Sequence, residues 1–171
     1  GPGAAAADAC SRCGLELPSL SAGILDRLAP HVPGTGSVGN PVDLTFTKNP
    51  MDYFEAVPQI LLDDPDAAGL LVYFLMPERI VMQALESMGV PRDQVEAQAR
   101  AVVTEQARVI AALREDQTKP LLGFSFRSRD DLFIRELLDR GVPVFPSPER
   151  AAGAMAALVA YGRFKGKVSR T

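Results

Sequence analysis

Runs of apolar residues alternate with amphipathic segments along the whole chain. Residues 69–76 are apolar without alternation, which is typical of a strand buried on both faces of a sheet, and residues 121–126 predict a second strand. Shorter runs at 142–145 and 38–44 predict one further strand each, the latter a weak one. Because the run at 142–145 contains Pro143, we expect that strand at an edge of the sheet. About four strands are therefore predicted.

Between these runs, apolar residues recur every three or four positions, as in amphipathic helices. Pro50 favours a helix start, whereas Gly14, Gly89 and Gly141 favour helix ends. Pro58 predicts a kink inside the third helix. Helices are expected at residues 3–13, from a cap at 19 or 21 to 28, and at 50–62, 78–88, 92–114, 130–140 and 147–164.

Strands that alternate with helices predict an α/β domain with a mostly parallel sheet. In a flavodoxin-like sheet five strands take the order 2-1-3-4-5, and the first strand feeds the first helix. This chain opens on a glycine turn that runs directly into a helix. We therefore expect a three-layer flavodoxin-like domain over residues 1–171 whose first, central strand lies upstream of Gly1. The domain would then be a fragment of a larger multidomain chain.

Composition narrows the classes of function. The 171 residues carry a net charge of −3, with 23% charged and 47% hydrophobic residues. This balance argues against nucleic-acid binding, which needs a basic face. The longest apolar stretch, residues 67–77, is too short to span a bilayer, so no membrane partner is expected. Two cysteines and the absence of a recognisable secretory signal suggest the cytoplasm.

The first candidate site is the glycine turn itself. Backbone N–H groups at a helix N-terminus have no intrahelical partner and carry partial positive charge, so they bind anions. Gly1 and Gly3 allow close approach of the backbone, Pro2 fixes the entry angle, and Ala4 leaves room. The alternatives are a plain turn before a packing helix or, for the first two residues, a vector remnant.

An ordered set of motifs spans nearly the whole chain. It comprises the glycine turn with its helix, Gly-Asn-Pro-Val-Asp-Leu at residues 39–44, Lys-Pro-Leu-Leu at 119–122, and the segment 141–151. The set resembles the second flavodoxin-like domain of NDP-forming acyl-CoA synthetases, which are relatives of succinyl-CoA synthetase. The match departs from that family at Phe46 and Thr47, where glycine or an acidic residue is usual.

The resemblance implies that this chain is one domain of a multidomain enzyme. Such synthetases interconvert acyl-CoA, nucleoside diphosphate and phosphate with acid, CoA and nucleoside triphosphate through a phosphohistidine. The resemblance implies that Gly1, Pro2, Gly3 and Ala4 bind phosphate, and that this domain holds no catalytic residue. CoA, ATP or ADP, and Mg are then expected on partner domains that bind CoA, carry the phosphohistidine or form the ATP-grasp unit. An oligomeric assembly is also expected.

Two further groups of residues are candidate site residues. Asn40 and Asp43 are expected to support a loop beside the phosphate rather than to act chemically. Arg127 and Arg129 follow a strand's carboxyl end, where open α/β sheets bind ligands. They are candidates for anion contacts, with solvated surface arginines as the alternative.

Other patterns are interpreted as structural. The single histidine, His31, does not match a phosphohistidine motif and is expected at the surface. Cys10 and Cys13 are expected to pack within a helix, and no metal site is predicted. The acidic cluster at residues 63–66 is expected to form a turn.

Two other functions remain open. The first is a non-catalytic assembly or regulatory module, such as a synthetase-like region fused to an acetyltransferase. The second is a generic flavodoxin-like ligand binder.

Overall fold

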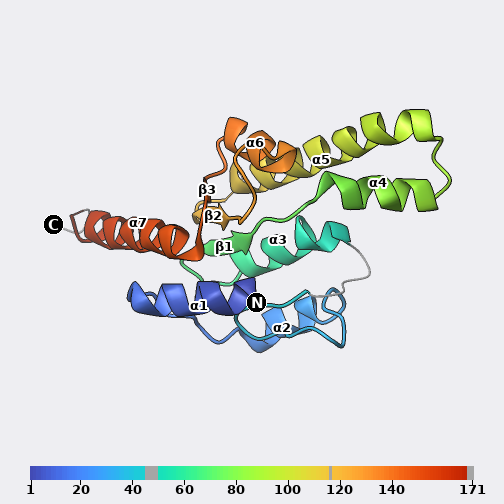
Figure 1. Cartoon of the computed structure of the whole chain (residues 1–171). Helices are drawn as coiled ribbons and strands as arrows, with labels where there is room; N and C mark the ends of the chain where they lie inside the picture. The colour runs from blue at the N-terminus through green and yellow to red at the C-terminus, as the bar shows by residue number, and fades with distance from the viewer. Residues whose placement is uncertain (45–49, 116, 169–171) are drawn as a thin grey trace.

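A parallel sheet lies in the middle of the domain, between two layers of helices (Figure 1). The computed structural model describes residues 1–44, 50–115 and 117–168. Within these residues the sheet has three strands in the order β1-β2-β3: β1 (Leu70–Tyr73), β2 (Leu121–Phe124) and β3 (Val144–Phe145). Both pairings are parallel. The α/β class and the edge position of the strand after Pro143 are thus confirmed.

Helices cover both faces of this sheet. On one face, α3 (Ala56–Leu62), α5 (Arg92–Glu115) and α6 (Leu132–Asp139) enclose the main core. On the other face, α1 (Pro2–Arg12) packs on α7 (Pro148–Val168) around Cys10 and Ala152. The remaining helices are α2 (Ala22–Leu28), the 3-10 helix η1 (Pro50–Tyr53) and α4 (Glu78–Ser87).

Helix ends follow the predicted signals closely. Gly14, Gly89 and Gly141 have φ values of 72°, 86° and 77°, the left-handed region in which glycine carries no steric cost. The predicted helices at 78–88 and 92–114 are α4 and α5, which pack together as a hairpin (Figure 1). Asp131 caps α6, because its carboxylate accepts the N–H groups of Phe133 and Ile134.

The strand predicted at residues 38–44 is wrong. This segment forms a turn closed by one antiparallel bridge, in which Ser37 and Asp43 exchange main-chain hydrogen bonds of 2.8 and 3.1 Å. The Asn40–Pro41 peptide bond inside the turn is cis. Gly39 and Pro41 leave too few consecutive apolar residues for a buried strand, which explains the difference.

The kinked helix predicted at residues 50–62 is also wrong. The structure has the short η1 and then a separate α3 that begins at Ala56. Pro58 is the third residue of α3, where its missing N–H would have had no intrahelical partner. The proline therefore lies in the first turn, where it interrupts no hydrogen bond of the helix. The departure noted at Phe46 and Thr47 lies outside the described residues.

Candidate functional site

The N-terminus of α1 is open. Gly1 is the N-cap residue and no side chain caps the helix. Ala5 donates its N–H to the Gly1 carbonyl at 3.2 Å, and Pro2 has no N–H. The donors left for a ligand in this turn are therefore Gly3 and Ala4. No acidic residue lies in the first turn, so nothing in it offsets the partial positive charge of the helix end.

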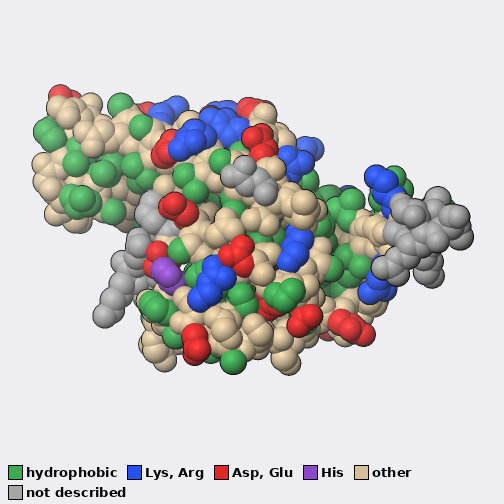
Figure 2. Space-filling view, turned by 180° about the vertical axis from the view of Figure 1, so that it is seen from behind, with side chains coloured by type: hydrophobic (Ala, Val, Ile, Leu, Met, Phe, Trp, Pro, Cys, Tyr) green, Lys and Arg blue, Asp and Glu red, His purple; other side chains and the backbone are tan. Residues whose placement is uncertain are grey.

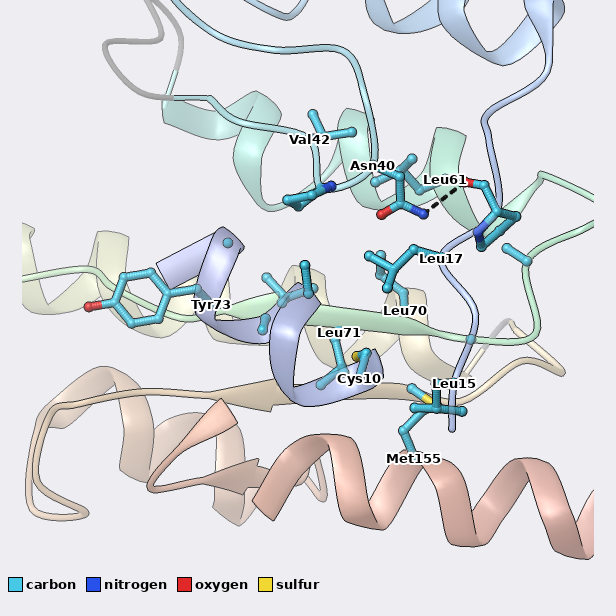
Figure 3. Close-up of a pocket in the computed structure, with 18 of the residues that line it drawn as sticks. Cys10, Leu15, Leu17, Asn40, Val42, Leu61, Leu70, Leu71, Tyr73 and Met155 are labelled. Carbon is cyan, nitrogen blue, oxygen red and sulfur yellow. Dashed lines mark hydrogen bonds between the residues drawn. The ribbon is translucent and has the colours of Figure 1, made fainter. Parts of the chain in front are cut away.

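The turn that contains Asn40 lies against this helix end. A methyl group added at Gly3 would sit 3.5 Å from the Cβ and Cγ atoms of Pro41. The Asn40 amide donates to the Pro18 carbonyl at 3.1 Å, which ties the turn to the segment that leaves α1 (Figure 3). Two of the motifs that carried the resemblance, far apart in the sequence, thus meet at one place.

A cavity of about 860 Å³ extends from this helix end along β1. Gly1 and Tyr73 both line it. Its walls are mostly apolar: Cys10 and Leu15 lie on one side, and Val42 and Leu61 lie on the other (Figure 3). We call this cavity the β1 slot, defined by β1 together with these four residues.

Tyr53 also lines the β1 slot, although nothing in the sequence marks it as a site residue. Its hydroxyl donates to the main-chain carbonyl of Tyr73. Burial raises the pKa of the Tyr53 phenol well above its usual value, and the nearby Tyr73 and Asp43 raise it further. The phenol therefore remains a proton donor throughout the physiological range. In the sequence, Tyr53 is only one of several aromatic and aliphatic residues in helical register.

The two candidate arginines are not part of this site. Arg127 pairs with Asp131 across 2.8 Å and lines a separate hollow at the carboxyl end of β2. Arg129 is exposed. Neither residue lines the β1 slot, so the structure does not bring them to the α1 N-terminus.

The acidic cluster at residues 63–66 forms the turn between α3 and β1, as predicted. Asp64 is fully buried, and its Oδ1 accepts the Asp66 N–H at 3.1 Å. Lys119 donates from Nζ to the carbonyl of Leu62 at 2.8 Å and also to that of Asp64. The lysine of the Lys-Pro-Leu-Leu motif therefore holds this turn against the start of β2.

The remaining candidates have structural surroundings. His31 has its Nδ1 3.0 Å from the Asp52 carboxylate, and Figure 2 shows the histidine at the surface, beside both acidic and basic side chains. Cys10 is buried in α1, as expected, whereas Cys13 is the exposed C-cap residue of that helix, so the prediction that it packs is wrong. Burial raises the pKa of the Cys10 thiol, and Cys13 raises it further. Within the described ranges, no three histidine, cysteine or acidic side chains gather as metal ligands. No helix in those ranges combines the length and apolarity needed to cross a bilayer.

Comparisons with known proteins agree with this architecture. A relative is the alpha subunit of the ADP-forming acetate–CoA ligase II of Pyrococcus furiosus, 28% identical over 161 residues, or 93% of this chain and 31% of that protein. The structure of PH0766 from Pyrococcus horikoshii OT3 matches 92% of this chain and 32% of its own, with a TM-score of 0.66 and 25% identity.

A third comparison concerns the fold. The dinucleotide-forming acetyl-coenzyme A synthetase 1 of Candidatus Korarchaeum cryptofilum, solved with phosphate and ADP, gives a TM-score of 0.67 at 22% identity. The match covers 99% of this chain and 32% of that one, so the chain spans about a third of these relatives. The family model of the Ligase-CoA domain matches residues 1–118, which is more than half of the chain. The chain therefore belongs to the Ligase-CoA domain family.

Proposed function

We propose that residues 1–171 form one domain of an NDP-forming acyl-CoA synthetase, and that the α1 N-terminus contributes to its phosphate site. Family membership supports the first part. So do the names of the relatives, one an ADP-forming acetate–CoA ligase and another a synthetase solved with phosphate and ADP. Because those proteins are about three times as long as the match, other domains would complete the enzyme.

The proposal that the α1 N-terminus contributes to the phosphate site rests on one observation, that Pro41 lies against Gly3 at the uncapped end of this helix. The helix end offers two free N–H groups and partial positive charge, the combination that binds phosphate oxygens. Pro41 holds the neighbouring turn against the glycine, and Asn40 anchors that turn to the Pro18 carbonyl. Asn40 and Asp43 act here as supports that keep the donors in position.

In this proposal the domain binds phosphate and performs no chemistry itself. Gly3 and Ala4 donate hydrogen bonds to the oxygens of a phosphoryl group carried by a histidine of another domain. The preorganised donors stabilise the charge of that group without having to reorient. CoA, ATP or ADP, and Mg bind on the partner domains, in an oligomeric cytoplasmic enzyme.

The test is a graded series at Gly3 in the full-length protein. Gly3→Ala should be tolerated, because its methyl group would lie 3.5 Å from Pro41, an ordinary contact distance. Gly3→Val adds methyl groups about 1.5 Å farther out, so they collide with Pro41 or displace it from the helix end. Incorporation of labelled phosphate into the enzyme should then fall at least about tenfold, equivalent to about 1.4 kcal/mol.

Gly153→Val is the matched control. Gly153 lies in α7, and a methyl group there would meet nothing within 4 Å. It introduces the same β-branched residue into a helix away from the site, and phosphate incorporation should stay at the wild-type level. Wild-type phosphoenzyme formation in a folded Gly3→Val protein would refute the role of the α1 N-terminus while leaving the family assignment untouched.

A further inference from the structure

The last turn of α1 carries two thiols that differ in exposure. Cys10 is 9% exposed and packs in a cluster with Ala152 of α7 and Leu71 of β1. Cys13, three residues later, is exposed and ends the helix as its C-cap residue. Both cysteines line the β1 slot, so they border the same cavity. A small oxidant from the solvent therefore reaches the Cys13 thiol first.

The main chain holds these two residues at a separation that a disulfide can span. The Cys13 N–H donates to the Cys10 carbonyl at 3.1 Å, across one helical turn. Helix geometry places Cα atoms three residues apart at about 5 Å, within the range of about 4.4–6.8 Å that disulfides need. The Cβ atoms of such residues lie about 5–6 Å apart, so the bond requires the turn to tighten by about 1–2 Å. Gly14 follows at a φ of 72°, past the end of the helix, so no later helical turn opposes this movement.

The charges around Cys10 do not favour its thiolate. Burial raises the pKa of the Cys10 thiol, and the neighbouring Cys13 raises it further. The helix end adds partial negative charge, and the nearby Arg12 is held by Asp8 at 3.0 Å and by Glu149 at 3.8 Å. Where a thiolate is stabilised, as at helix N-termini, the reduced form of a cysteine pair is favoured. Cys10 lacks that stabilisation, so a disulfide at this place gives up no favourable charge interaction of its thiolate.

We propose that Cys13 and Cys10 form a peroxide-sensitive dithiol that closes to a reversible disulfide in the last turn of α1. The oxidant is a hydroperoxide such as hydrogen peroxide. The Cys13 sulfur attacks one peroxide oxygen, the O–O bond breaks, and the other oxygen takes up the thiol proton and leaves as water. The Cys10 sulfur then attacks the Cys13 sulfenic acid, which forms the S–S bond and releases a second water. The inference is independent of the proposed function, because it concerns the end of α1 opposite to the phosphate donors.

The experiment is peptide mapping of the full-length protein before and after treatment with hydrogen peroxide. Free thiols are blocked by iodoacetamide in denaturant, and the protein is digested with trypsin without a reductant. Trypsin cleaves after Arg12, between the two cysteines, so a disulfide joins the peptide that ends at Arg12 to residues 13–27. Peroxide should raise the yield of this joined pair at least about tenfold, and dithiothreitol should release both peptides.

Two variants test the order of the steps and the spacing. Cys10→Ala leaves the exposed thiol without its partner, so Cys13 should accumulate as a sulfenic acid that dimedone traps, at least about tenfold more than in the wild type. Cys13→Ser combined with Ser11→Cys is the matched control, with an exposed thiol at the wrong spacing, because adjacent side chains on a helix do not face each other. It should form no disulfide with Cys10. Both of its changed positions are exposed, so this control remains available if Cys10→Ala does not fold.

A Cys10 thiol that iodoacetamide still blocks fully after peroxide treatment would overturn the proposal, whether Cys13 is then unchanged or a sulfinic acid. A Cys13 that is joined to any cysteine other than Cys10 would also overturn it. So would equal disulfide formation in the matched control, because the spacing of the two thiols would then be irrelevant.

Discussion

Gly123 is the position at which one methyl group should matter most. It lies in β2, the central strand, and a Cβ atom there would be 2.1 Å from the Cδ2 and Cε2 atoms of Phe74. Non-bonded carbon atoms are best separated by about 3.5–4.0 Å, so in Gly123→Ala the ring has to retreat by about 1.5 Å. Phe74 is 1% exposed and packs edge-on against Phe133, with ring centroids 6.1 Å apart. The ring therefore has little room to retreat.

The size of the effect follows from this confinement. Overpacking a core lowers the free energy of unfolding by about 1–3 kcal/mol. Because β2 and Phe133 confine the Phe74 ring, we expect a loss of about 3 kcal/mol for Gly123→Ala. Phe74→Ala alone should cost about 3–5 kcal/mol through the cavity it leaves. In the double variant the new methyl group enters the space vacated by the ring. The combined loss should therefore be close to that of Phe74→Ala, with a coupling of about 2–3 kcal/mol.

Urea denaturation followed by far-ultraviolet circular dichroism measures these losses, since the chain contains no tryptophan. Gly153→Ala is the control: its methyl group meets open space in α7, and better helix propensity should raise the free energy of unfolding by about 0.5–1 kcal/mol. A free energy of unfolding for Gly123→Ala within about 0.5 kcal/mol of the wild-type value would refute this prediction. So would a double variant in which the losses from Gly123→Ala and Phe74→Ala add fully.

Three further predictions test local contacts by the same denaturation assay. Lys119→Met removes the donor of two main-chain carbonyls in the turn after α3 and should cost about 2 kcal/mol; an unchanged midpoint would contradict this. Asp131→Ala uncaps α6 and should cost about 1 kcal/mol, whereas Asp131→Asn keeps a capping oxygen and should cost less. The Arg27 side chain lowers the pKa of Asp63, chiefly by a hydrogen bond of 2.6 Å. Arg27→Gln should therefore cost about 0.5 kcal/mol at neutral pH. Because the folded-state pKa lies below the unfolded one, this difference should vanish as the pH falls through the folded-state pKa; a difference that persists in acid would argue against the ion pair.

Much of the fold could be predicted from local signals. The apolar runs that became β1 and β2 have no alternation because both faces of the sheet are covered. The glycines that end helices adopt φ angles that other residues avoid, so the helix ends can be predicted from the positions of these glycines. The apolar residues among 38–44 predict a strand, but Gly39 and Pro41 favour a turn, and the turn is what forms.

The geometry of the candidate site could be predicted from the sequence only in small part. The glycine turn predicts an open helix end, because capping depends on neighbouring residues only. Its contact with Pro41 joins positions far apart in the chain, and no periodicity encodes such a contact. The hydroxyl of Tyr53 was missed for a similar reason: in the sequence the residue shows only a hydrophobic ring in step with its neighbours. The positions of Arg127 and Arg129 relative to α1 also depend on the folded sheet.

The hydrogen bond from Tyr53 to the Tyr73 carbonyl also limits how far main-chain pairing can extend along β1. That carbonyl is the last acceptor of β1, and a phenol from outside the strands already holds it. A chain segment that paired with this edge would find no free acceptor at Tyr73, so its pairing with β1 would end there. Gly1, at which α1 begins, lines the same cavity as Tyr53 and Tyr73. A side chain of η1 therefore occupies the last carbonyl of β1, at the cavity that the α1 N-terminus also lines.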